Sequence, residues 1–227
     1  MKAVILAGGL GKRLGRLTSE IPKPMIKVMG RPVLEHILLH LKKHGITDII
    51  ICIGYLHHKV QKHFGDGSAF GVKITYYIEK ELLGTGGALK QVEGVVDGTF
   101  LVLFGDLIVD MDLGKLIAFH KSKGGLGTLT VHASDHPHDS DLVEVAQDGS
   151  IIRFPGKPKE GQIFVNITNA GVYCFEKPIL KYFPTGISML DKEVLPSVIA
   201  KGGKLFAYFT KETVHDMGTP DRLERAR

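Results

Sequence analysis

A short apolar segment that runs directly into glycines is the strongest constraint on how this chain folds. Residues 2–6 (KAVIL) are apolar and partly β-branched, which predicts a buried strand. Residues 7–11 (AGGLG) follow at once. With no side chains in front of them, the backbone N–H groups of such a loop can surround phosphate oxygens. Because Lys12, Arg13 and Lys23 add positive charge nearby, we predict a phosphate-binding loop.

Two well-known glycine motifs do not fit this loop. A Walker A loop needs a glycine five positions before its Gly-Lys pair and a hydroxyl after it, but Leu6 and Arg13 stand there. The dinucleotide fingerprint needs a third glycine where the chain has Leu14. The remaining alternative is a tight turn that uses glycine only for positive φ. The cations beside the loop favour phosphate binding.

Strand-like and helix-like segments alternate over the first half of the chain. Continuous apolar runs and helical periodicity predict strands over 48–54, 72–79 and 99–104 and helices over 33–44 and 55–64. Repeated βα units predict an α/β fold, Rossmann-like, with a mixed, mostly parallel sheet flanked by helices. Ligands of such sheets bind beyond the carboxyl ends of the strands.

A glycine-rich segment over 123–127 separates this half from a second half that is richer in strands. Asp110 and Asp112 are expected to cap a helix over 113–121, and Thr219 to cap a last helix that starts at Pro220. The remaining predicted elements are a helix near 89–95, strands over 129–133, 142–146, 151–154, 172–175 and 205–209, and a helix over 188–199.

Two groups of histidines raise the question of a metal site. His36, His40 and His44 recur every four residues, but His36 and His40 lie opposite the apolar stripe of the predicted helix, which favours a solvent-exposed face. Histidines and aspartates also cluster over 134–141 (SDHPHDSD). Their spacing matches no regular ligand pattern, so a polar hairpin or lid loop is the preferred interpretation.

Composition limits the classes of partner. A net charge of +5 and a pI of about 9.1 suit small anionic substrates, and no basic run with interleaved aromatic residues suggests nucleic acid. The apolar runs are too short to span a membrane, and the N-terminus has no signal-peptide pattern. Cys52 and Cys174 lie in apolar runs, which favours two free thiols in a cytoplasmic protein over a disulfide.

Residues 6–14 (LAGGLGKRL), followed by 22–25 (PKPM), closely resemble the signature of the sugar-1-phosphate nucleotidyltransferases. The resemblance covers essentially the whole chain. It implies an enzyme that converts an NTP and a sugar 1-phosphate into an NDP-sugar and pyrophosphate, with Mg²⁺ as cofactor. It also implies one domain over 1–227, with a nucleotide-binding part over 1–123 and a small β-rich sugar-phosphate-binding part over 124–227.

The resemblance places the nucleoside against residues 83–87 (LGTGG), whose glycines permit close approach by a ligand. Relatives read the base with a Gln or Glu shortly before this element, and we choose Glu79 over Glu81. A carboxylate only accepts hydrogen bonds, which matches the two adjacent donors of guanine and favours GTP. The alternative is that Glu79 is a solvated strand end. The predicted nucleotide-binding residues are Leu6, Ala7, Gly8, Gly9, Gly11, Lys12, Arg13, Glu79, Gly84, Thr85 and Gly105.

Two aspartates resemble the metal ligands of the family. Asp106 follows the predicted strand 99–104, where a carboxylate can hold a hard cation, although a turn or cap aspartate is the alternative. Asp216 lies in residues 215–220 (HDMGTP), which resemble the segment that carries the second ligand. The resemblance therefore implies that Asp106 and Asp216 bind Mg²⁺.

The predicted sugar-phosphate-binding residues are Asp106, Lys157, Asn169 and Gly171. Lys157 stands in residues 156–158 (GKP), where relatives carry Glu-Lys-Pro, and it would contact the phosphate of the sugar. Gly156 lacks the carboxylate that would contact a sugar hydroxyl, which leaves space for a larger or differently turned sugar. Asn169 and Gly171 resemble the sugar-binding Asn-Ala/Ser-Gly of the family.

The resemblance assigns catalysis to Arg13, Lys23 and Asp106. Arg13 would bind the leaving pyrophosphate and Lys23 would stabilise charge at the α-phosphate. No protein nucleophile is needed, because the attacking sugar phosphate is already an anion.

Residues 132–157, with Asp141-Leu142 where many relatives have Tyr-Gly, resemble the D-glycero-D-manno-heptose 1-phosphate guanylyltransferases. These are often joined to a phosphatase, and the abrupt end after Thr219-Pro220 suits a piece of such a fusion as well as a minimal enzyme. We therefore favour GTP and D-glycero-α-D-manno-heptose 1-phosphate. The alternatives are a mannose-1-phosphate guanylyltransferase, a uridylyl- or thymidylyltransferase, and a non-catalytic nucleotide-sugar sensor. A homo-oligomer and a fused or separate phosphatase partner are compatible with this interpretation.

Overall fold

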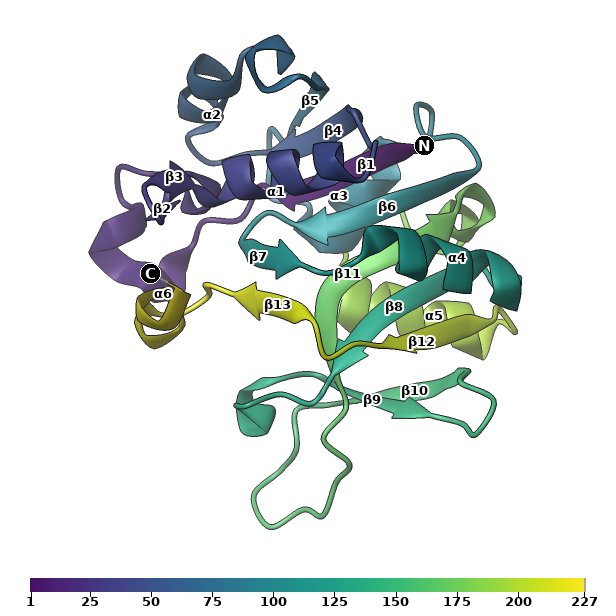
Figure 1. Ribbon diagram of the computed structural model, residues 1–227. Coiled ribbons are helices and arrows are strands. Elements are labelled where there is room, and N and C mark those ends of the chain that lie inside the picture. The colour runs from purple at the N-terminus through teal and green to yellow at the C-terminus, as the bar shows by residue number, and fades with distance from the viewer. Residues whose placement is uncertain (227) are drawn as a thin grey trace.

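The computed structural model describes residues 1–226, and of Lys12 and Ala226 it describes the backbone alone. Its centre is a mixed sheet of nine strands that runs β10-β9-β11-β6-β1-β4-β5, with β8 beside β11 and β12 beside β8 (Figure 1). The strands of the core path are β1 (Lys2–Ala7), β4 (Asp48–Ile53), β5 (Lys73–Ile78), β6 (Thr99–Phe104) and β11 (Thr168–Glu176). The remaining strands of this sheet are β8 (Gly127–His132), β9 (Leu142–Val145), β10 (Ile151–Gly156) and β12 (Leu205–Phe209).

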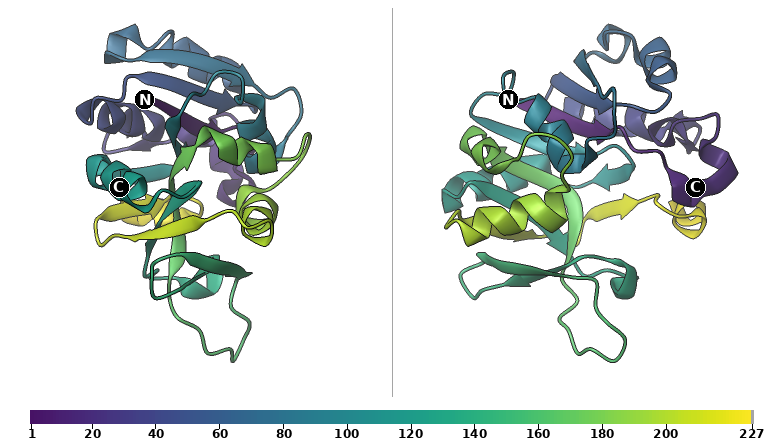
Figure 2. Two further views of the ribbon diagram at one scale, coloured as in Figure 1. Left: turned by 90° about the vertical axis from the view of Figure 1, so that its right-hand side faces the viewer. Right: turned by 180° about the vertical axis from the view of Figure 1, so that it is seen from behind.

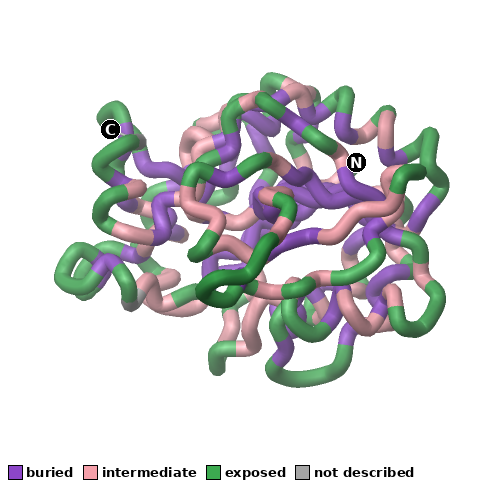
Figure 3. The backbone as a smooth tube through the Cα atoms, turned by 90° about the horizontal axis from the view of Figure 1, so that it is seen from below, coloured by how far each residue is buried: buried purple, intermediate pink, exposed green. Residues whose placement is uncertain are grey.

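The predicted α/β fold is confirmed. The strand β1 lies between β4 and β6 and is parallel to both, and β5 is parallel to β4, whereas β11 runs antiparallel to β6. The strands β1, β4 and β6 are buried over almost their whole length. Buried backbone accordingly runs through the middle of the molecule (Figure 3). Strands covered on both faces read as continuous apolar runs, which is why the sequence locates them well.

Helices cover both faces of the sheet (Figure 2). One apolar core lies between the sheet and the helices α1 (Val33–Lys43), α2 (His57–Phe64) and α4 (Leu113–Lys123). The other lies on the opposite face, under the helices α3 (Gly84–Gln91) and α5 (Leu195–Ala200). Among the described residues no helix is long and apolar enough to cross a membrane.

Short elements complete the chain. A two-stranded sheet of β7 (Leu107–Asp110) and β13 (Thr213–Asp216) leads into α6 (Pro220–Ala226). The other short elements are β2 (Lys27–Val28), β3 (Arg31–Pro32) and the helical turns η1 (Lys12–Thr18), η2 (Lys23–Met25), η3 (Ser68–Phe70), η4 (Pro137–Asp139), η5 (Lys177–Tyr182) and η6 (Leu190–Val194).

Several local predictions change in detail. The helix expected near 89–95 begins at Gly84, and the helix expected over 188–199 is the π-helical turn η6 followed by α5. Asp112 caps α4 by accepting a hydrogen bond from the Lys115 N–H at 3.1 Å. Asp110 is not a cap, because it pairs with Thr213 between β7 and β13.

The solvent-exposed histidine face predicted on α1 is wrong for His40. Its side chain is buried, and its Nε2 lies 2.9 Å from the carbonyl oxygen of Met111, just after β7. His36 similarly contacts the carbonyl oxygen of Val28 at 2.8 Å. Burial lowers the pKa of His40. Backbone carbonyls of neighbouring segments form hydrogen bonds with the imidazole rings of these histidines. The histidine face of α1 can therefore pack against the protein although its residues are polar.

The two cysteines are free and buried, as predicted. Burial raises the pKa of the Cys174 thiol to about 12 and raises that of Cys52 further. Both thiols are therefore unreactive, since the thiolate is the reactive form. The cytoplasmic location stays a prediction.

Candidate active site

Two adjoining cavities open at the carboxyl ends of β1 and β6. The first, of about 590 Å³, lies beside the glycine loop, and the second, of about 900 Å³, lies toward β8, β11 and β13. Arg13, Phe104, Asp106 and Met189 line both cavities and form the boundary between them. This is the edge of the sheet where open α/β folds bind ligands.

The first cavity is lined by most of the residues that the sequence analysis predicted to bind the nucleotide. Lys23 and Asp106 also line this cavity. The prediction for Lys12 concerns a side chain that lies outside the described part of the chain. The predicted nucleotide-binding residues that line the first cavity are Leu6, Ala7, Gly8, Gly9, Gly11, Arg13, Glu79, Gly84, Thr85 and Gly105.

Gly8 has a specific steric role in this cavity. A Cβ atom added there would lie 2.1 Å from Oε1 of Glu79, so only glycine leaves room for the carboxylate beside the loop. Glu79 is half-buried and its Oε2 accepts a hydrogen bond from the Leu83 N–H at 3.1 Å. Burial raises the pKa of Glu79, and the bond from Leu83 opposes this shift. Glu79 is thus held at the cavity rather than being a fully solvated strand end.

The glycines of 83–87 divide into two groups. Gly84 and Thr85 line the first cavity, but the prediction that Gly86 and Gly87 admit a ligand is wrong. A Cβ on Gly86 would lie 2.5 Å from Oγ of Ser188, and one on Gly87 would lie 2.3 Å from the carbonyl oxygen of Gly186. These two glycines therefore allow α3 to pack against the segment before η6.

Gly86→Ala tests this packing. We expect the substitution to destabilise the fold by about 1–3 kcal/mol, the cost of an added methyl group in a filled interior. Urea unfolding of the variant and the wild type measures the difference. Gly94→Ala is the matched control, because nothing lies within 4 Å of the added Cβ and its φ is not positive. Equal losses in both variants would contradict the packing role.

An ion pair stands at the boundary between the cavities. Lys23, at the start of η2, donates a hydrogen bond from Nζ to Oδ2 of Asp106, which follows β6. The side chains are only 14% and 22% exposed. The sequence separates the two by 83 positions, and the fold brings an ammonium and a carboxylate together where both cavities end.

Asp216 approaches Asp106 through the pairing of β7 with β13. The register places Asp216 opposite Leu107, and the Met217 N–H donates to the carbonyl oxygen of Asp106 at 3.0 Å. Arg222 donates from Nη1 to both oxygens of Asp216 at 2.9 Å. Burial acts to raise the pKa of Asp216, but the hydrogen bonds from Arg222 and Gly218 outweigh it and the pKa is lowered.

The donor set at Asp106 and Asp216 fits a hard divalent cation, since it consists of carboxylate oxygens brought to one edge. Each carboxylate is paired with a cationic side chain, Lys23 or Arg222, so a bound cation would share or replace these partners. In the described part of the chain no group of three or more His, Cys, Asp or Glu side chains could hold a metal ion. A cation here would therefore complete its shell with ligand oxygens or water.

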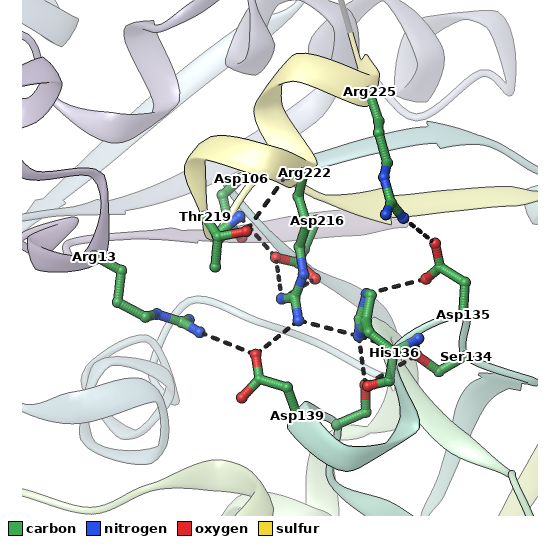
Figure 4. A network of polar contacts seen from close by, with 12 residues as sticks. Arg13, Asp106, Ser134, Asp135, His136, Asp139, Asp216, Thr219, Arg222 and Arg225 are labelled. Atoms are coloured by element: carbon green, nitrogen blue, oxygen red, sulfur yellow. Dashed lines mark hydrogen bonds and ion pairs between the residues drawn. The ribbon is translucent and has the colours of Figure 1, made fainter.

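The second cavity contains a cluster of cations around Asp139 (Figure 4). Lys157 donates to Oδ1 of Asp139 and Arg222 donates to Oδ2 at 2.8 Å, while Nη1 of Arg13 lies 3.9 Å from Oδ2. The hydrogen bond from Lys157 is the main cause of the lowered pKa of Asp139. The loop over 134–141, predicted as a hairpin or lid, thus contacts Arg13 in η1 and Arg222 in α6.

Asn169 and Gly171 also line the second cavity, but the amide of Asn169 is largely used within the protein. Its Nδ2 donates to the hydroxyl of Tyr173 at 2.7 Å and to Oδ1 of Asp191 at 2.8 Å. Its Oδ1 accepts from the Gly171 N–H at 3.2 Å. The sequence analysis noted Asp139 only as part of the polar cluster over 134–141, and it missed Asp191 and Arg222, for which no motif or spacing gave a signal.

The fold and the cavities define an α/β protein with two adjoining cavities, lined by glycines, aspartates and cationic side chains, at the carboxyl edge of its sheet. The sequence pattern of the nucleotidyl transferase family matches residues 2–227. The chain belongs to this family of enzymes.

Three relatives illustrate the similarity. The chain is 35% identical over 229 residues to a mannose-1-phosphate guanylyltransferase of Mycobacterium tuberculosis, covering 98% of this chain and 62% of that protein. A Bacillus anthracis structure assigned as a glucose-1-phosphate thymidylyltransferase, in complex with a sucrose, is 26% identical with a TM-score of 0.89, covering 100% of this chain and 93% of the other. HddC from Yersinia pseudotuberculosis complexed with GMP-PN is 27% identical with a TM-score of 0.84, covering 99% and 97%. The chain spans about three-fifths of the length of the curated relatives that it matches.

Proposed function

We propose that this chain transfers a nucleotidyl group from an NTP to a sugar 1-phosphate and releases pyrophosphate. The observation that carries the proposal is the pair of Lys23 and Asp106 at the boundary of two cavities, one beside the predicted phosphate-binding loop and one rich in cations. A reaction that joins two phosphorylated substrates needs two such cavities that meet at the reacting phosphate. The part over 1–123 would supply most of the first and the part over 124–227 most of the second.

Each group has a role in an in-line displacement at the α-phosphate. The backbone of Gly8, Gly9 and Gly11 would bind the triphosphate, and Arg13 would neutralise the departing pyrophosphate. Lys157 would hold the phosphate of the sugar, whose oxygen attacks. Lys23 would stabilise the charge that develops at the α-phosphate. Catalysis is then mainly positioning and electrostatic stabilisation.

Asp106 and Asp216 would hold Mg²⁺. The ion would supply charge neutralisation at the phosphates of the nucleotide. Lys23, whose ammonium lies beside Asp106, would act on the α-phosphate.

We expect GTP as the nucleotide, read by the carboxylate of Glu79. Glu79→Gln should lower kcat/KM for GTP by about 10- to 100-fold, the value of a hydrogen bond to a charged group, and should reduce the preference over UTP. KM for GTP should rise as the pH falls through the raised pKa of Glu79, because the protonated form cannot accept both guanine donors. Initial rates with both nucleotides measure these effects.

Glu81→Gln is the matched control for this prediction, since Glu81 is exposed and only two positions away. An unchanged GTP preference in Glu79→Gln, or the same change in both variants, would exclude Glu79 as the residue that reads the base. Similarity to a guanylyltransferase and to a structure with GMP-PN supports GTP, whereas similarity to a thymidylyltransferase supports the alternative.

For the sugar we propose D-glycero-α-D-manno-heptose 1-phosphate, with mannose 1-phosphate as the second candidate. Gly156 beside Lys157 supports a larger sugar, because nothing lies within 4 Å of the space where its Cβ would be. Similarity to a mannose-1-phosphate guanylyltransferase supports the second candidate.

The test is pyrophosphate release with Mg²⁺, for four NTPs against heptose, mannose, glucose and N-acetylhexosamine 1-phosphates. Release with one pair, lost in Asp106→Asn, would establish the reaction and both substrates. If no pair of substrates releases pyrophosphate while the nucleotide still binds, the result would favour the other class, a non-catalytic nucleotide-sugar sensor. A homo-oligomer and a phosphatase partner remain further predictions for the same preparation.

A further inference from the structure

The second cavity has a carboxylate in its wall that the sequence analysis did not assign. Asp191 lies in η6 and lines the second cavity together with Asn169 and Gly171. The residue is half-buried and lines the cavity. Burial raises the pKa of Asp191 to about 6. A carboxylate kept in such surroundings needs hydrogen-bond donors, because burying an unpaired charge is costly.

Two donors hold one oxygen of this carboxylate. Oδ1 of Asp191 accepts from Nδ2 of Asn169 at 2.8 Å and from the hydroxyl of Tyr173 at 2.9 Å. Tyr173 is fully buried in β11, and its hydroxyl also accepts from Asn169. Each of the three side chains is hydrogen-bonded to the other two. Asn169 and Tyr173, both in β11 of the central sheet, therefore hold the Asp191 carboxylate in place.

The second oxygen is left available. Among the described residues no hydrogen-bond donor reaches Oδ2 of Asp191. A carboxylate has about four acceptor positions, of which Asn169 and Tyr173 use two. Asn169, by contrast, has both of its amide hydrogens engaged and its oxygen accepts from Gly171. Oδ2 of Asp191 is therefore an acceptor that remains available at this cavity, whereas Asn169 has no amide hydrogen left to donate.

The same cavity offers a place for a phosphate. Arg13, Lys157 and Arg222 line it, and their charges suit the phosphate of a sugar 1-phosphate. Sugar hydroxyl groups donate hydrogen bonds. A carboxylate oxygen in a fixed position accepts them only from hydroxyls that point toward it. Gly156, next to Lys157, brings no side chain that could do so.

We propose that Asp191 is a specificity-determining residue that accepts hydrogen bonds from hydroxyl groups of the sugar, and that Asn169 and Tyr173 are positioning residues that orient its carboxylate. This deepens the proposed function and rests on it. Asn169 then acts through Asp191, which revises the direct sugar contact predicted from the sequence. The residue at position 191 selects which hydroxyl pattern binds.

Asp191→Asn tests the proposal, because it keeps the shape and replaces an acceptor by a donor group. We expect KM for the sugar 1-phosphate to rise about 10- to 100-fold, while KM for the NTP stays within about twofold. Asp97→Asn is the matched control, since Asp97 is exposed and contacts only Lys177 among the described side chains. Tyr173→Phe, which removes one donor to Oδ1, should raise KM for the sugar by a smaller factor.

Deoxy sugar 1-phosphates separate recognition from a structural effect. For the analogue that lacks the contacted hydroxyl, wild type and Asp191→Asn should have the same KM, a ratio of about one. A structural defect would instead weaken all analogues by the same factor, and this result would overturn the proposal. So would an unchanged KM for the complete sugar.

Calorimetric titration of the wild type and Asp191→Asn with the same sugar phosphates compares their binding affinities without turnover. A wild type that binds the sugar phosphate but releases no pyrophosphate with any NTP would count against the proposed function alone. A wild type that turns over normally, with Asp191→Asn indistinguishable from it, would count against Asp191 alone. If Asp191→Asn does not fold, Tyr173→Phe with the deoxy analogues decides between recognition and structure.

Discussion

Lys23→Ala is expected to lower kcat by about two orders of magnitude or more, with a smaller effect on the KM of either substrate. Loss of one donor that stabilises transition-state charge has an effect of this size. Lys23 is held by Asp106 at the boundary of the two cavities, where the α-phosphate would react. Single-turnover and steady-state rates of pyrophosphate release measure the loss.

Lys27→Ala controls for the removal of a lysine from the same segment, because Lys27 is exposed and lines neither cavity. Thermal unfolding of Lys23→Ala shows whether the unpaired Asp106 disturbs the fold. Near-normal turnover in a folded Lys23→Ala protein would remove Lys23 from the mechanism. A large rise in KM with unchanged kcat would make it a binding group instead.

Asp106→Asn is expected to reduce turnover by a comparable factor, about 100-fold or more, and to raise the Mg²⁺ concentration that gives half-maximal activity. The amide keeps the size of the side chain but loses the charge that a divalent cation needs. Activity across a Mg²⁺ titration, together with Mn²⁺ binding followed by electron paramagnetic resonance, measures both effects.

Asp110→Asn is the matched control, since Asp110 lies four residues further on and is exposed in β7. It should leave turnover and Mg²⁺ dependence unchanged. Full activity of Asp106→Asn at low Mg²⁺, or Mn²⁺ binding equal to that of the wild type, would show that Asp106 is not a ligand.

The central sheet could be predicted from the sequence because its strands are continuous apolar runs bounded by glycines and polar residues. The helix α1 was located for a similar reason, but its histidine face was not, since the bond from His40 to the Met111 carbonyl depends on a segment 71 residues away. The helix α3 starts earlier than its apolar pattern suggests. Glycines are poor helix formers, and the close contacts of Gly86 with Ser188 and of Gly87 with Gly186 explain their place in a helix.

The first cavity follows from local sequence more than the second does. A glycine loop after a strand is a continuous segment, and it lines the first cavity as expected. The second cavity depends on pairs such as Arg222 with Asp139, 83 positions apart, and Asn169 with Asp191, 22 positions apart. Single polar residues at such separations have no period or spacing that distinguishes them from surface residues.

Asp139 determines how the three cations of the second cavity are arranged before a sugar phosphate binds. Its carboxylate already gathers Arg13, Lys157 and Arg222 before any ligand enters. Under the proposed function, an arriving phosphate dianion would replace this monoanionic carboxylate as the partner of the three cations. Ordering three long side chains normally opposes binding through lost entropy, and here that loss occurs during folding. The substrate would thus meet an arrangement that a built-in anion has already preorganised, with weaker dependence on ionic strength than three unpaired cations would produce.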